Sequence, residues 1–165
     1  MKVKESLGWK SKWTIEKFKD DKAYTKGKPY AVESFEGNIG LQEGRQELID
    51  LICGIGSPTK WDNTNARLGV GDSSTAENET QDGLQAATNK FWKGMLATYP
   101  QKTDQTAEWK AEFVSGEANF AWEEFTVVNA SDDAGKNLNR KVVSKGTKSS
   151  GETWTLSLKI TFNAS

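Results

Sequence analysis

The sequence predicts a mainly β protein: an antiparallel β-sandwich, of jelly-roll or immunoglobulin-like type, with one short α-helix. Three observations lead to this prediction. Apolar and polar residues alternate near both ends of the chain, turn residues separate several short apolar segments between them, and only one segment has a helical stripe. A chain of 165 residues is large enough to form a single sizeable core.

Two long strands are expected where side chains alternate with a period of two, residues 3–18 and residues 153–162. Side chains of a strand point alternately to its two faces, so such a segment has one buried face. The apolar positions are Val3, Leu7, Trp9, Trp13 and Ile15 in the first segment, and Trp154, Leu156, Leu158, Ile160 and Phe162 in the second.

Turn residues bound the remaining strands, predicted within residues 30–35, 66–71, 90–99, 106–114, 120–129 and 138–145. Residues 38–54 instead carry a helical stripe that Gly54 can end. The glycine-rich segment from Gly54 divides the chain into an N-terminal region, residues 1–55, and a β-sandwich body, residues 56–165. The same alternation would suit a separate N-terminal domain, a swapped segment or strands that complete the sheet of the body.

The composition argues against most catalytic chemistry. Histidine is absent, which removes the commonest general base and the commonest metal ligand. Adjacent Glu123 and Glu124 would point to opposite faces of a strand, one as a solvated residue and one as an interface charge. We therefore expect no enzyme, no cofactor and no metal. Cys53, beside Leu51 and Ile52, is expected to be a small buried apolar residue.

Charge and hydropathy also limit the partners. Twenty-two basic residues nearly balance twenty-three acidic ones, so no whole-protein field attracts nucleic acid or an anionic membrane. The first residues lack the apolar stretch of a signal peptide, and no run of about 18 apolar residues occurs. We expect a protein made in a cytoplasm, with no membrane and no specific nucleic acid among its partners.

The tryptophans are the clearest candidates for binding. Seven are many for one small core to hide, so some are expected at an interface. Trp109 and Trp154 lie on alternating strands and are assigned to the core, whereas core and interface remain equal alternatives for Trp61 and Trp92. The interface candidates are Trp9, Trp13, Trp61, Trp92 and Trp122. Exposed tryptophan can also stack on sugar, which makes carbohydrate binding the principal alternative.

Four segments carry a resemblance to a known group of proteins: residues 66–76 (ARLGVGDSSTA), 80–84 (TQDGL), 115–124 (SGEANFAWEE) and 146–154 (GTKSSGETW). Together they resemble structural proteins of tailed bacteriophages, in which a strand ending in a Gly-x-Gly turn precedes a β-rich body. The resemblance covers residues 60–163, and its short motifs specify a backbone shape more than a task.

This resemblance implies a non-enzymatic structural protein of the virion, made in the host cytoplasm. The positions it suggests are the collar, neck, viral tail, fibre attachment, baseplate adaptor or capsid decoration. The expected partners are other virion proteins and copies of the chain itself, as a homo-oligomer in a ring or trimer. The alternative is a carbohydrate-binding β-sandwich module for host surface recognition, with weak glycan contact. An enzyme of unrecognised type is the third possibility.

Overall fold

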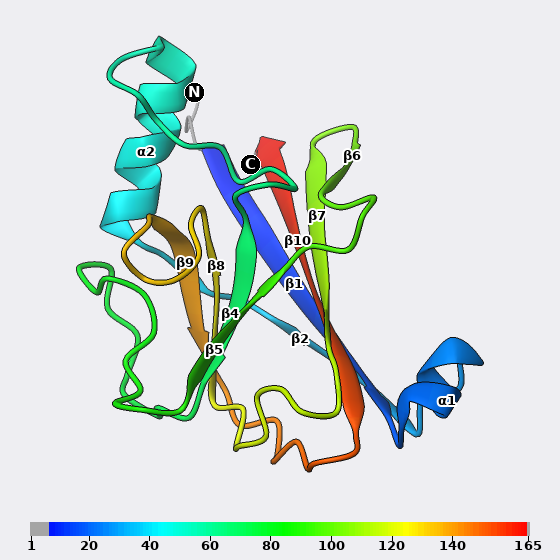
Figure 1. Ribbon diagram of the computed structural model, residues 1–165. Coiled ribbons are helices and arrows are strands. Elements are labelled where there is room, and N and C mark those ends of the chain that lie inside the picture. The colour runs from blue at the N-terminus through cyan, green and yellow to red at the C-terminus, as the bar shows by residue number, and fades with distance from the viewer. Residues whose placement is uncertain (1–6, 165) are drawn as a thin grey trace, which may run out of the picture.

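A computed structural model describes residues 7–164, which form two antiparallel five-stranded sheets packed against each other (Figure 1). The predicted mainly β fold, a sandwich with a short helix, is confirmed. The β1 sheet has the order β2-β1-β10-β7-β6, and the β8 sheet has the order β3-β9-β8-β4-β5. The strands of the β1 sheet are β1 (Leu7–Phe18), β2 (Ala31–Glu36), β6 (Gln101–Thr103), β7 (Thr106–Phe113) and β10 (Thr153–Ala164). Those of the β8 sheet are β3 (Ile39–Gly40), β4 (Arg67–Gly71), β5 (Lys90–Gly94), β8 (Glu124–Val128) and β9 (Asn137–Val142).

The two long alternating segments pair with each other. Strands β1 and β10 lie antiparallel along twelve residue pairs, from Leu7 opposite Ala164 to Phe18 opposite Thr153. Residues 7–55 therefore contribute two strands to the β1 sheet and one strand, β3, to the β8 sheet. The N-terminal region and the body share one sandwich. The start of the predicted first strand, Val3–Ser6, lies outside the described residues.

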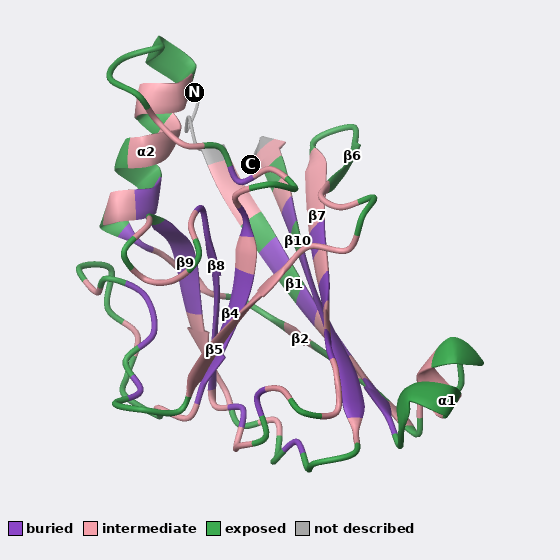
Figure 2. Ribbon diagram, in the orientation of Figure 1, coloured by how far each residue is buried: buried purple, intermediate pink, exposed green. Residues whose placement is uncertain are grey.

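The core lies between the sheets and is largely aromatic. Trp122 is central: its ring centroid lies 4.9 Å from that of Trp154 and 4.9 Å from that of Phe113, both in edge-on contact. From the β1 sheet, Trp13 reaches Phe125 of β8 at 5.8 Å between ring centroids. The inward residues in the middle of the central strands are buried (Figure 2). Burying each such side chain stabilises the fold by about 1.5 to 3 kcal/mol.

The predicted helix is α2 (Gln42–Cys53), which ends at Gly54 in the left-handed conformation with φ 65°. Glycine at position 44 disfavours a helix, but here it allows close packing. A Cβ atom at Gly44 would lie 2.5 Å from the Asn137 carbonyl oxygen and 2.5 Å from the Leu138 Cα. The glycine thus lets the first turns of α2 rest directly on β9.

Several local predictions need correction. The helix α1 (Asp21–Thr25) and the short strands β3 and β6 were not predicted. Asp20 caps α1, because its side chain accepts a hydrogen bond from the Ala23 amide. Strand β5 ends at Gly94 and β8 begins only at Glu124. Cys53 is exposed, because α2 extends past the sheets before its last turn (Figure 1).

Neither α1 nor α2 has the length and apolar character that a membrane-crossing helix requires, within the part of the chain that is described.

Candidate functional site

Three of the five interface candidates belong to the core. Trp13 and Trp122 are completely buried and Trp61 is 7% exposed. Trp13 stacks on Phe35 with an interplanar angle of 5°, and Trp122 donates a hydrogen bond from Nε1 to the Ala118 carbonyl. The interface prediction is wrong for these three residues, because the aromatic core between the two sheets has room for more indole rings than expected.

Trp9 and Trp92 are the two candidates that keep partial exposure. Trp92 lies on the edge strand β5 and donates from Nε1 to the Asp133 carboxylate at 3.3 Å. Trp9 lies near the start of β1, and its ring centroid is 6.0 Å from that of Phe162. The structure does not bring the five tryptophans together into one surface.

The exposed apolar surface lies elsewhere, on the distal end of α2 and the turn after it. Ile49, Ile52 and Ile55 are 58%, 79% and 62% exposed. On the side of the same helix that faces the sandwich, Leu48 and Leu51 pack against the core. The helical stripe predicted within residues 38–54 includes Ile49 and Ile52 as well as these leucines. This apolar stripe is wider than the helix surface that the sandwich can cover. Its width is the sequence signal for the exposed isoleucines, and it was overlooked.

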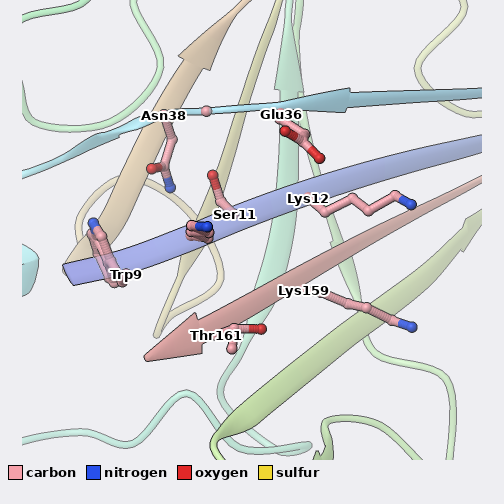
Figure 3. Close-up of a pocket in the computed structure, with 9 residues that line it drawn as sticks. Trp9, Ser11, Lys12, Glu36, Asn38, Lys159 and Thr161 are labelled. Carbon is pink, nitrogen blue, oxygen red and sulfur yellow. The ribbon is translucent and has the colours of Figure 1, made fainter. Parts of the chain in front are cut away.

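A groove of about 500 Å³ opens at the end of the β1 sheet, beside Trp9 (Figure 3). Its floor and walls come from β1, β10 and the segment that leaves β2. The lining residues are Trp9, Lys10, Ser11, Lys12, Glu36, Gly37, Asn38, Lys159 and Thr161. Apart from Trp9, no residue of this groove was singled out from the sequence. The signal was present in the unequal lengths of the two neighbouring segments, since the strand predicted at 30–35 is much shorter than that at 3–18.

Two polar groups at this groove lack a hydrogen-bond partner among residues 7–164. They are the Ser11 hydroxyl and the Asn38 side-chain nitrogen, and both atoms are buried. Figure 3 shows the Ser11 hydroxyl and the Asn38 amide in the space between β1 and the segment that carries Glu36 and Asn38. Buried polar groups are normally paired, so this pair calls for a physical explanation.

The strongest buried charges form a different cluster, on the outer face of the β8 sheet. Glu124 and Arg140 have completely buried side chains, and an Arg140 guanidinium nitrogen lies 2.7 Å from the Glu124 carboxylate. The same carboxylate accepts hydrogen bonds from the backbone amides of Gln85 and Ala86, each at 2.8 Å. Arg140 also donates to the Thr75 carbonyl at 3.0 Å and to the Gln81 side chain at 2.9 Å.

This cluster fastens the long loop of residues 72–89 onto the sheet. Each partner of the ion pair holds a different part of that loop, so the charges are satisfied inside the protein and closed to a substrate. Glu124, expected as a solvated or interface charge, is therefore a buried structural residue. The error has a physical cause: the loop covers the sheet face that strand alternation assigns to solvent.

A third buried charge links two turns of the body. Lys148 is buried and donates to the Val114 carbonyl at 2.9 Å and to the Asn119 side chain at 2.8 Å. Burial disfavours the ammonium form and lowers the pKa of Lys148 from its ordinary value. Both acceptors belong to the protein itself, so Lys148 has a structural role: it holds two turns together.

The arrangement defines the class of the protein as a two-sheet antiparallel β-sandwich whose paired charges hold its own loops. Its surface features are an exposed apolar helix end and a polar groove beside Trp9. No protein-family model, curated protein or solved structure matches the chain.

Proposed function

We propose that the protein is a non-enzymatic structural subunit of a tailed-phage particle, acting by packing against copies of itself and against other virion proteins. Its place in the particle would be the collar, neck, tail, baseplate adaptor or capsid decoration. The observation that carries the proposal is the exposed set Ile49, Ile52 and Ile55 at the end of α2. A group of large aliphatic side chains that are mostly exposed near one another is typical of an interface.

Two further features support an assembly role. The sandwich is held by an extended aromatic core and by the buried Glu124–Arg140 ion pair, so it offers a rigid platform for the apolar helix end. The edge strand β2 also carries Val32, which is 58% exposed on the outer face of the sheet. An exposed apolar residue on an edge strand favours association with another chain.

The test is the mass of the purified protein by light scattering over a concentration series, with mass spectrometry of virions in parallel. We expect a discrete ring or trimer, and stoichiometric copies in particles. The double substitution Ile52→Lys and Ile55→Lys should yield folded monomers with an unchanged circular-dichroism spectrum, because both side chains are exposed in the subunit. The matched control is Ser149→Lys with Ser150→Lys, which adds the same charge on the exposed turn before β10. A strict monomer that is absent from particles would overturn the proposal.

Carbohydrate binding is the second candidate, and the groove beside Trp9 is the observation that favours it. Its lining combines one indole with amide, hydroxyl and ammonium groups, the chemistry that sugars use. Only one half-buried tryptophan lies there, so the stacking surface is small. A glycan array probed with the monomeric double variant would test this role separately from assembly.

A further inference from the structure

The edge of β1 is only partly covered by its neighbour. All twelve residues of β1 pair with β10, but β2 pairs only with Lys12–Lys17. Beyond Glu36 the chain turns at Gly37 and crosses to β3 in the β8 sheet, with a last hydrogen bond from the Gly37 amide to the Ser11 carbonyl at 3.3 Å. Within residues 7–164, the flank of β1 before Ser11 therefore has no strand beside it on the β2 side.

The register shows which backbone groups point to this open flank. On the β2 side, the carbonyls of Ser11 and Lys17 accept hydrogen bonds from the Gly37 and Tyr30 amides. In an antiparallel pair, every second residue directs both its N–H and its C=O to the same neighbour. Trp9 is in phase with Ser11, so its amide and carbonyl face the open flank. Lys10, out of phase, directs its amide to β10.

The groove of Figure 3 lies along this flank and is net basic. Three lysines line it, Lys10, Lys12 and Lys159, against a single carboxylate, Glu36. Lys159 lies 3.5 Å from Glu108, whereas Lys10 and Lys12 form no ion pair with any residue from 7 to 164. The surplus charge favours an acidic occupant.

The buried Ser11 hydroxyl and Asn38 side-chain nitrogen, unpartnered within residues 7–164, border the same flank. Ser11 is 6% exposed, so its hydroxyl forms part of a built floor instead of a solvated surface. Both groups can donate to a carbonyl or carboxylate oxygen. An extended chain that continued the line of β2 past Gly37 would bring such oxygens to this place.

We propose that the open flank of β1 at Trp9 binds an extended acidic segment of a neighbouring protein, which adds to the β1 sheet as a short strand beyond the end of β2. The Trp9 backbone supplies the strand hydrogen bonds, and Lys10, Lys12 and Lys159 select glutamate or aspartate side chains. This mode of recognition combines main-chain pairing with side-chain selection. The inference rests on the proposed assembly role, in which neighbouring subunits supply the segment.

The test uses the full-length protein and a blocked octapeptide of alternating valine and glutamate, with the valine and lysine analogue as control. Amide hydrogen exchange by NMR is the readout. On addition of the acidic peptide, the Trp9 amide should become protected at least tenfold. The Lys10 amide, already bound to β10, should change little. The basic analogue should protect neither.

Charge reversal supplies the matched variants. Lys10→Glu with Lys12→Glu should abolish protection by the acidic peptide, while Lys26→Glu with Lys28→Glu, on the exposed turn after α1, should leave it intact. All four lysines are exposed, so both variants should fold, and their spectra check this.

Three outcomes would overturn the inference: no protection of Trp9 by millimolar peptide, equal protection by the basic analogue, or groove shifts with an oligogalacturonate but no protection of the Trp9 amide. The last outcome would assign the groove to a glycan. A discrete oligomer that does not bind the peptide would contradict this inference but support the assembly role. A protein that binds the peptide but is absent from virions would support peptide binding at the open flank and contradict the assembly role.

Discussion

The two sheets follow the same alternation of side chains, but they use it differently. In β7 of the β1 sheet, Trp109, Ala111 and Phe113 are buried while the residues between them are half-exposed. In β8 of the other sheet, all five residues are buried. The loop of residues 72–89 covers the outer face there, and the Glu124–Arg140 pair holds it. The outer face is therefore polar in both strands, but only in β7 is it half-exposed. In β10, beside β7, the outer-face residues Thr153, Thr155 and Ser157 are buried as well.

The largest effect should come from breaking the ion pair under the loop. Arg140→Met leaves Glu124 as a buried charge without its partner, which costs about 3 to 5 kcal/mol of unfolding free energy. Urea denaturation measures the loss. The double variant Arg140→Met, Glu124→Leu should recover a large part of it, because it removes the unpaired charge. The control Thr14→Val, on the outer face of β1, should stay within about 0.5 kcal/mol. Equal losses for Arg140 and Thr14 would contradict the contrast between the sheets.

Substitution of two strand glycines, one in each sheet, should show the same difference between the sheets with a smaller change in stability. A Cβ atom added at Gly71 in β4 would meet the Glu124 carboxylate oxygen at 2.4 Å, whereas one at Gly8 in β1 would meet no atom within 4 Å. We expect Gly71→Ala to destabilise the fold by about 1 to 3 kcal/mol, since the buried carboxylate has no room to shift. Gly8→Ala should be neutral or stabilising by up to about 1 kcal/mol. Thermal denaturation of both variants provides the comparison, and a stable Gly71→Ala protein would show that the cluster is loosely packed.

The smallest effects concern the pH dependence of stability. A carboxylate on the β1 sheet and one on α2, against the β8 sheet, should change the free energy of unfolding in opposite directions as the pH falls. The hydrogen bond and charge of Lys17 hold the pKa of Glu33, on β2, below its ordinary value of 4.5. Glu33 thus contributes stability above pH 4.5 that is lost as the pH falls through its lower pKa in the folded protein. Burial raises the pKa of Glu43, on α2 against β9, so its charge carries a cost at neutral pH that disappears as the pH falls through this raised pKa.

Substitution by glutamine separates the two carboxylates. Compared with the unchanged protein, Glu33→Gln should lose less thermal stability between pH 7 and pH 4, and Glu43→Gln should lose more. The Glu43 carboxylate accepts a hydrogen bond from the Asn137 amide at 2.7 Å, and glutamine retains an oxygen for that bond. Shifts of the midpoint in the same direction for both variants would contradict the assigned environments.

Much of the fold could be predicted from local pattern. Strand β10 was predicted to within two residues of its observed end, because its alternation is uninterrupted from Thr153 to Phe162. Helix α2 and its end at Gly54 were also predicted, since the left-handed cap requires glycine-like freedom. The short elements β3 and β6 could not be predicted, because two or three residues carry no period and pair only where another strand is already in place.

The candidate surfaces were harder to predict than the strands. Trp13 and Trp122 were assigned to an interface on number alone, and Ser11, Asn38 and the open flank of β1 were not noticed. Whether an indole is buried depends on the facing sheet, and an open flank depends on where the neighbouring strand stops. Neither is a property of a local segment.

The sequence by itself determined that this chain folds as antiparallel strands with one amphipathic helix, because alternation and turn residues act locally. Only the tertiary structure decided that the first and last strands pair, that a loop buries Glu124 with Arg140, and that β2 leaves part of β1 uncovered. The physical reason is that burial and pairing depend on which segments meet in space, and such segments can lie far apart along the chain, as Leu7 and Ala164 do.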